Sequence, residues 1–217
     1  MIRRPPLPDP RIISYQTLRR AVGFIGVGLP FVLALGDILI FHGDGVRRSV
    51  SSYYYTPMRG VLVGALWAIG VFLFAYKGYD RLDSWSSNLA GLLATGVALL
   101  PVAPLHHPSA TARIVGYLHL ALAGLLFLTL AFIAWFLFTK TAPGGQRTQR
   151  KRTRDLIYRI CAVIIVVTVI LGAIVHLHVG PAILRLKPEF WLEAIAIVAF
   201  GLSWLVKGQI VVKDQRV

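Results

Sequence analysis

The segment RRSVSSYYYTPMR, residues 47 to 59, connects two apolar runs that are each long enough to cross a lipid bilayer. It contains serines, three consecutive tyrosines, a threonine and a proline, with arginines at both ends. So polar and aromatic a composition is unusual for a connection in such an apolar chain. We therefore expect this connection to organise the fold and to mark the functional end of the molecule.

The overall composition is that of a membrane protein. Of the 217 residues, 56% are hydrophobic and 15% are charged, and the mean hydropathy of +0.68 is too high for an ordinary soluble domain. A formal charge of +14 would suggest nucleic-acid binding in a soluble protein, but the distribution of the charges described below accounts for it, so no nucleic-acid partner is predicted. The single cysteine, Cys161, excludes an intramolecular disulfide and a Cys-pair zinc site.

Six segments contain enough consecutive apolar residues to span a membrane. They are residues 21–41, 60–76, 88–105, 114–138, 156–179 and 190–206. The sequence therefore predicts an all-α, polytopic six-transmembrane-helix bundle. Its parts are a basic N-terminal segment (1–20), the six-helix transmembrane domain (21–207) and a tail (208–217).

The basic residues are divided unequally between the two ends of these predicted helices. If the N-terminus is cytoplasmic, seventeen of the 23 Lys and Arg residues fall on the cytoplasmic side. The other six are Arg47, Arg48, Arg59, Arg113, Arg185 and Lys187. Because cytoplasmic loops carry an excess of Lys and Arg, we expect both termini to be cytoplasmic and the protein to be multi-pass in the bacterial inner (plasma) membrane.

Aromatic residues gather near both predicted membrane interfaces, where amphipathic rings prefer to lie. The inner group is Tyr76, Tyr79, Trp85, Trp135, Tyr158 and Trp204, and the outer group is Tyr53, Tyr54, Tyr55, Tyr117 and Trp191. These two groups support the six spans independently of the charge count.

Small residues at four-residue spacing, Gly60, Gly64 and Ala68, form a stripe on the second predicted helix. Such a stripe lets a neighbouring backbone approach closely. We expect it to pack against another helix of the chain or, alternatively, to form a homo-oligomer contact.

Ionisable residues within the predicted helices gather toward the outer side. Asp37, His119, His176 and Glu193 lie in the outer halves of four different helices. Intramembrane ionisable groups usually face a bundle interior or a water-filled cavity, so we expect a polar pocket that opens outward. With the neighbouring connection, this pocket would bind or move a membrane lipid or small amphiphile; its predicted ligand-binding residues are Asp37, Ser51, Ser52, Tyr54, Tyr55, Arg59, His119 and Glu193.

Two enzymatic alternatives use the same residues. His119 and His176 with Glu193 or Asp37 could supply three zinc ligands, which would make the protein a metal-dependent hydrolase of lipid amides or esters, although no HExxH pair occurs. Ser51 or Ser52 could instead be a nucleophile, with His119 as its base and Asp37 or Glu193 orienting the base, but no GxSxG motif is present. Apart from zinc no cofactor is expected, and a structural or partner-binding membrane subunit remains a third alternative.

Four phrases resemble a known family. They are SSYYYTPMRGVLVG (51–64), IGVFLFAYKGYDR (69–81), HLALAGLLFLTLAF (119–132) and FWLEAIAIVAFGLSWLVKG (190–208). Together they resemble a family of bacterial six-helix membrane proteins defined by a domain of unknown function, which is more distantly similar to the eukaryotic DRAM and Sfk membrane proteins linked to lipid handling. The resemblance implies a six-helix plan and marks, without a role, Ser51, Ser52, Tyr54, Tyr55, Arg59, Asp80, His119 and Glu193.

Overall fold

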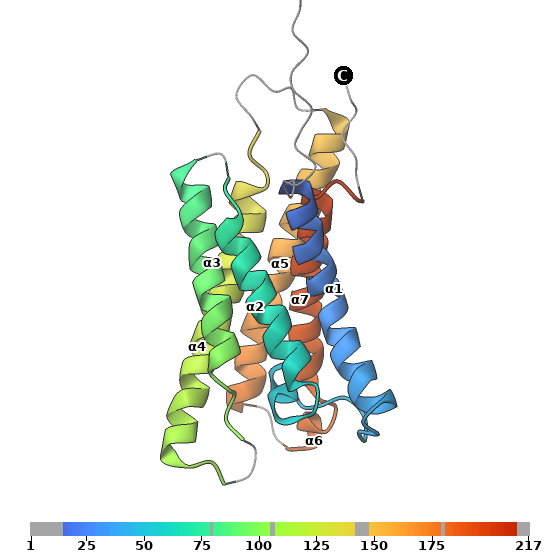
Figure 1. The fold of residues 1–217 in the computed structure, drawn as a ribbon, viewed down its shortest axis with the longest axis vertical. Helices are drawn as coiled ribbons and strands as arrows, with labels where there is room; N and C mark the ends of the chain where they lie inside the picture. The colour runs from blue at the N-terminus through green and yellow to red at the C-terminus, as the bar shows by residue number, and fades with distance from the viewer. Residues whose placement is uncertain (1–14, 79, 105–106, 142–147, 179–180, 212–217) are drawn as a thin grey trace, which may run out of the picture.

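The structure is a computed structural model that describes residues 15–78, 80–104, 107–141, 148–178 and 181–211. Over these residues it is all-helical, and its six long helices run up and down alongside one another (Figure 1). They are α1 (Tyr15–Leu39), α2 (Arg59–Ala75), α3 (Arg81–Leu99), α4 (Ala110–Phe132), α5 (Gln149–His178) and α7 (Pro188–Lys207). Three short elements complete the fold: the 3₁₀ helix η1 (Ser51–Tyr55), the π-helical turn η2 (Ile133–Leu137) that continues α4, and α6 (Pro181–Leu184).

Within the described residues, four helices are long and apolar enough to cross a membrane: α1, α4 with η2, α5 and α7. The other two fall short for local reasons. Helix α2 is apolar but has only 17 residues, and α3 opens with the polar sequence RLDSWSSN. Each of the six predicted apolar runs nevertheless lies largely within one long helix, and the four apolar helices are compatible with a membrane protein.

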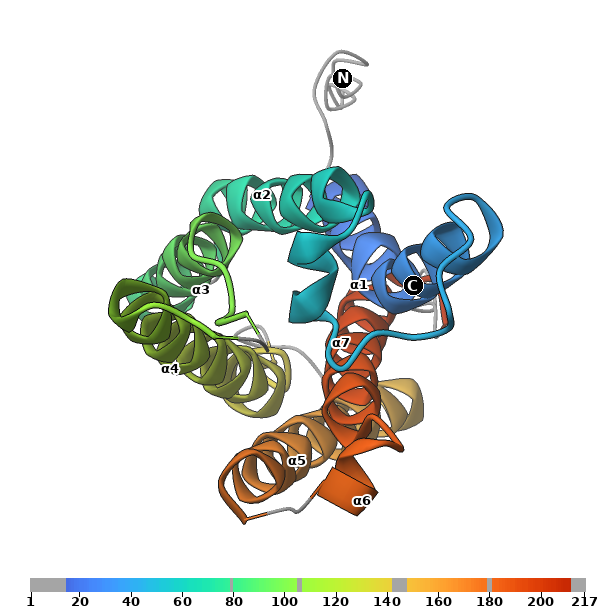
Figure 2. The ribbon, with the colours of Figure 1, turned by 90° about the horizontal axis from the view of Figure 1, so that it is seen from below.

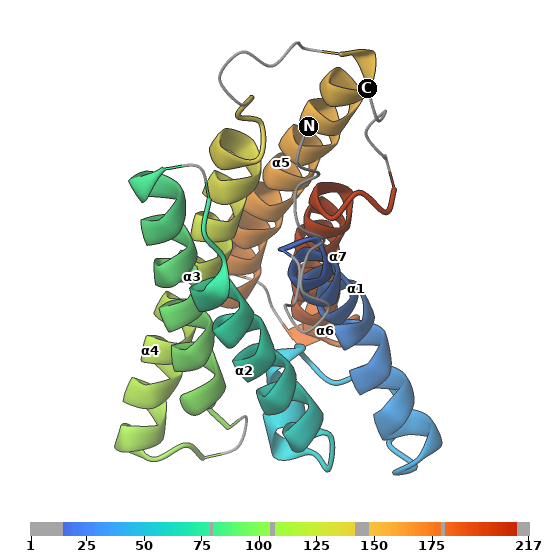
Figure 3. The same ribbon diagram turned by 45° about the horizontal axis from the view of Figure 1, so that its top comes forward.

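The long helices form a ring. Seen along the bundle, the order around the ring is α1, α2, α3, α4, α5 and α7, and η1 lies inside it (Figure 2). Helix α1 packs along α7, and α5 packs along the other side of α7 (Figure 3). Helix α1 begins and α7 ends at the same end of the bundle (Figure 1); the opposite end, which carries η1, is called the η1 end below.

Glycines set the closest helix contacts. Where α1 crosses α7, an added Cβ on Gly201 would lie 2.5 Å from the backbone nitrogen of Val27 and 2.8 Å from the carbonyl oxygen of Gly23. Where α2 crosses α3, a Cβ on Gly91 would lie 2.9 Å from the carbonyl oxygen of Gly70. Small residues let helix backbones approach this closely, and such contacts are typical of helices packed in membranes.

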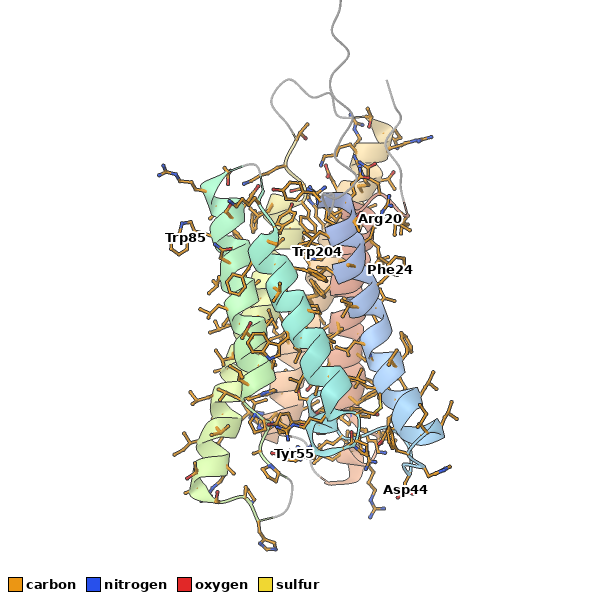
Figure 4. The ribbon with its side chains drawn as sticks, viewed as in Figure 1. Arg20, Phe24, Asp44, Tyr55, Trp85 and Trp204 are labelled. Atoms are coloured by element: carbon orange, nitrogen blue, oxygen red, sulfur yellow. The ribbon has the colours of Figure 1, made fainter. Side chains whose placement is uncertain are left out.

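The aromatic residues at the end opposite η1 divide into a buried and an exposed group. Tyr76, Tyr158 and Trp204 are 5%, 2% and 1% exposed and pack with Phe138 in the core, so assigning them to an interfacial belt was wrong. Trp85 is 74% exposed and Trp204 lies inside the bundle (Figure 4). The buried rings face inward, where they pack edge to face against one another and against Phe138, a geometry that aromatic pairs prefer. Tyr79 lies outside the described residues.

The stripe on α2 does not pack within the chain. Gly60 and Gly64 are both exposed, and an added Cβ on either would meet no atom within 4 Å. The expectation of an intrachain packing role is therefore wrong for these two glycines, because this face of α2 turns away from its neighbours. A homo-oligomer contact through Gly60, Gly64 and Ala68 stays a prediction.

Candidate functional site

The connection that precedes η1 is tied to the start of α7. The Lys187 ammonium donates a hydrogen bond to the Val46 carbonyl oxygen, and the Phe190 N–H donates to the Arg48 carbonyl oxygen at 2.9 Å. The Arg48 guanidinium also pairs with the Glu189 carboxylate through two hydrogen bonds, of 2.7 and 2.9 Å. Paired bonds of this kind fix orientation as well as distance, so η1 is held against α7.

Two apolar side chains anchor η1 inside the ring. Val50 and Tyr53 are 2% and 0% exposed, and they belong to a buried cluster with Leu29, Leu33, Ala34, Met58, Leu62, Phe190 and Ala194. Because these neighbours come from α1, α2 and α7, η1 closes the η1 end of the ring at the point where the three helices meet. Ser51 and Ser52, which lie between these two anchors, both line the cavity inside the ring.

Ser51, His119 and Glu193 meet at this point. The Ser51 Oγ lies 3.1 Å from the His119 Nε2 and 3.4 Å from Glu193 Oε2, and the Ser51 N–H donates to the same Glu193 oxygen at 3.1 Å. His119 is 4% exposed. Three elements that are distant in the sequence thus bring a hydroxyl, an imidazole and a carboxyl group into hydrogen-bond contact.

The backbone between α3 and α4 orients the His119 ring. Its Nδ1 lies 2.6 Å from the Leu100 carbonyl oxygen. Gly116, one turn before His119, allows this segment to approach α4, since an added Cβ on Gly116 would lie 2.8 Å from the backbone nitrogen of Ala103. The imidazole is therefore held from both sides, by a carbonyl at Nδ1 and a hydroxyl at Nε2.

A cavity of about 640 Å³ lies inside the ring next to this cluster. All six long helices contribute to its wall, which is mainly apolar along α2, α4, α5 and α7, with side chains such as Leu66, Leu126, Phe127, Leu130 and Ile197. The polar lining gathers toward η1 and includes Arg48, Ser49, Ser51, Ser52, Arg113, His119, His176, Glu189 and Glu193. The cavity is thus apolar over much of its length and polar at one end.

Four of the eight predicted ligand-binding residues line this cavity: Ser51, Ser52, His119 and Glu193. The cavity lining does not include the other four, Asp37, Tyr54, Tyr55 and Arg59. Asp37 is fully buried and pairs with the Arg47 guanidinium at 2.7 Å. That hydrogen bond raises the pKa of Arg47 above its usual value. Because Asp37 lies in α1 and Arg47 in the connection that follows it, the pair ties this connection to the end of the helix.

The two tyrosines and Arg59 interact around η1. The Arg59 guanidinium donates to the Tyr54 hydroxyl at 2.6 Å and lies 4.1 Å from the centroid of the Tyr54 ring. The Tyr55 hydroxyl donates to the Val102 carbonyl oxygen at 2.6 Å. These contacts link η1 to the start of α2 and to the residues that follow α3. The two tyrosines and Arg59 therefore hold η1 in position without lining the cavity.

The predicted zinc ligands divide between two clusters. His119 and Glu193 both contact Ser51, whereas the His176 Nδ1 lies 3.5 Å from Glu189 Oε1, in the cluster with Arg48. Among the described residues, no group of three His, Cys, Asp or Glu side chains is placed to hold a metal ion. The zinc site of His119, His176 and Glu193 stays a prediction that elemental analysis of the purified protein tests.

Sequence reasoning missed the Leu100 carbonyl and the pairing of Arg48 with Glu189. A main-chain carbonyl has no signal in the sequence, because every residue carries one. The ion pair joins residues 141 positions apart, and no local spacing predicts it.

The fold and site define an all-helical protein whose apolar helices suit a membrane and enclose a cavity with a polar end. Comparisons with protein-family models, with curated proteins and with solved structures gave no match to this chain. We therefore infer the function from the geometry of the site.

Proposed function

We propose that this protein spans the bacterial inner membrane six times, with both termini cytoplasmic, and binds or moves a lipid or small amphiphile in its central cavity. The observation that carries the proposal is the separation of polarity within the cavity. Hydrocarbon chains gain free energy on leaving water for an apolar lining, whereas a headgroup needs hydrogen-bond partners. The cavity offers both, at opposite ends.

The polar end suits a headgroup that contains phosphate or carbonyl oxygens. Arg48 and Arg113 both line the cavity, and arginine binds phosphate through paired hydrogen bonds. Glu189 already engages Arg48, so a zwitterionic headgroup would find charges of both signs there. A volume of about 640 Å³ lies within the usual range for small-molecule sites, roughly 300–1,000 Å³.

The space between α4 and α5 supports entry from the bilayer. Gly124 and Gly172 line the cavity from these two helices, and an added Cβ on either would meet no atom within 4 Å. Leu120 and Leu177 also line it and are 36% and 72% exposed. The cavity wall is thus continuous with exposed apolar side chains, so an acyl chain can pass between the helices without crossing water.

Filling this space tests the proposal. We expect Gly124→Phe and Gly172→Phe to lower the amount of lipid that co-purifies in mild detergent by at least about tenfold, which corresponds to 1.4 kcal/mol of lost binding free energy. The matched control is Gly28→Phe on α1, which also has no atom within 4 Å of an added Cβ but does not line the cavity. Mass spectrometry of extracted ligands measures the effect, and equal lipid in all three variants and the wild type would contradict the proposal.

Cysteine labelling tests the proposed orientation. Cys161 is 2% exposed and is expected to be unreactive, so single cysteines can be introduced in its presence. In spheroplasts, a membrane-impermeant maleimide should label Thr111→Cys near the η1 end and leave Arg152→Cys at the start of α5 unlabelled until the membrane is permeabilised. Both positions are exposed. The reverse pattern would overturn the orientation.

A further inference from the structure

We propose that Ser51 is a nucleophile activated by His119, and that the protein hydrolyses an ester-linked acyl chain of an amphiphile bound in the cavity. This inference rests on the proposed function, because it takes the substrate from the class that the cavity would bind. Two observations support it. The Ser51 hydroxyl lies within hydrogen-bond distance of His119, and the hydroxyl of its neighbour Ser52 instead contacts Ser49.

The hydrogen bond at Nδ1 decides what His119 can do. A carbonyl oxygen only accepts hydrogen bonds, so at 2.6 Å from the Leu100 carbonyl the Nδ1 of His119 must carry the hydrogen. In the neutral imidazole, Nε2 is then unprotonated and can accept a proton. This nitrogen lies 3.1 Å from Ser51 Oγ, within the range required of a general base.

The backbone of the proposed nucleophile, Ser51, is also held in position by a hydrogen bond. Glu193 Oε2 accepts the Ser51 N–H at 3.1 Å, which fixes the backbone at the first residue of η1. A buried base held by a third group, next to a hydroxyl, is the arrangement that serine nucleophiles require. Here the Leu100 carbonyl orients the base, and Glu193 is a positioning residue for Ser51.

Ser52 lacks these features, although it lines the same cavity. Its Oγ lies 2.7 Å from Ser49 Oγ, and its N–H donates to the same Ser49 oxygen at 3.0 Å. A serine pair of this kind supplies no base. The geometry therefore favours Ser51 over Ser52 as the nucleophile.

The reaction needs only the amphiphile and water. Ser51 Oγ attacks the ester carbonyl carbon while its proton moves to His119 Nε2, and a tetrahedral intermediate forms. The bond between this carbon and the alcohol oxygen breaks, the alcohol leaves with the proton from Nε2, and the acyl group remains on Ser51. Water then attacks the acyl carbon with Nε2 again taking a proton, and return of that proton to Ser51 Oγ releases the carboxylic acid.

An alkyl fluorophosphonate tests for the activated serine directly, because Ser51 Oγ would attack phosphorus and displace fluoride to leave a stable adduct. In purified full-length protein we expect the adduct on the peptide that contains Ser51. Ser51→Ala should abolish labelling. Ser84→Ala, at a serine of α3 that does not line the cavity and whose hydroxyl donates to the Asp80 carbonyl oxygen, should leave it unchanged. His119→Gln should slow it by about 10²–10⁴-fold, the usual contribution of a general base.

Two further measurements separate the roles. Glu193→Ala should slow labelling while Glu193→Gln retains it, because glutamine keeps an oxygen that accepts the Ser51 N–H; equal slowing in both would overturn the positioning role. Labelling should be insensitive to 1,10-phenanthroline. Loss of labelling with the chelator and its return with zinc would overturn the serine mechanism in favour of a metal site.

Lipid retained by the same samples distinguishes the two proposals. Wild-type protein that keeps its lipid but forms no adduct would overturn this inference and leave the proposed function standing. Equal labelling of the wild type and Ser51→Ala would overturn it as well. An adduct on Ser51 in protein that retains neither lipid nor the alcohol or carboxylic acid derived from it would support the activated serine and contradict the proposed binding function.

Discussion

Arg47→Ala is expected to lower the free energy of unfolding by about 3 kcal/mol, the lower end of the range for breaking a buried ion pair. The reason is the carboxylate that the substitution leaves behind. Asp37 is fully buried in α1, and its bond to the partly exposed Arg47 is 2.7 Å long. Its second oxygen has no hydrogen-bond partner among the described residues. Thermal or denaturant unfolding in detergent measures the change.

A second substitution separates the charge from the packing of the arginine. In the Arg47→Ala background, Asp37→Asn should restore part of the lost stability, because a neutral amide costs much less to bury than an unpaired carboxylate. Arg59→Ala is the matched control: Arg59 makes an exposed contact with Tyr54, so its loss should cost less than about 1 kcal/mol. Equal effects of Arg47→Ala and Arg59→Ala would refute the buried-pair argument.

Gly201→Ala is expected to destabilise the bundle by about 3 kcal/mol, at the upper end for overpacking. The added Cβ would lie 2.5 Å from the Val27 nitrogen and 2.8 Å from the Gly23 carbonyl oxygen. Both atoms belong to the backbone of α1, so neither can move aside as a side chain would. Helices α1 and α7 would have to separate, which would also disturb the position of Glu193 on α7.

The control for Gly201→Ala is a glycine of α1 that does not take part in the close contact with α7. Gly28 is in α1, where an added Cβ would meet no atom within 4 Å. Gly28→Ala should therefore be neutral or stabilising by up to about 1 kcal/mol, the helix-propensity difference between the two residues. Unfolding measurements in which both variants lose equal stability would show that the close helix crossing is not what limits Gly201.

The helices could be predicted from the sequence because hydrophobicity is a local property of a run of residues. Each of the six apolar runs lies largely in one long helix. Part of the site was also predictable: polar side chains such as His119 and Glu193 are costly in apolar helices, and both line the cavity. Asp37 does not line the cavity; the cost of burying its carboxylate is offset by the ion pair with Arg47.

By itself, the sequence determined the helical class, the approximate extent of the helices and a short list of polar residues with a reason to meet. Only the tertiary structure decided which of them do. The contact of Ser51 with His119 joins residues 68 positions apart and that with Glu193 joins residues 142 apart. Such contacts depend on the rotation of each helix and on how closely glycines let the backbones approach, and hydrophobic periodicity fixes neither. The Leu100 carbonyl that sets the His119 tautomer is a main-chain group, so folding alone could bring it to the imidazole.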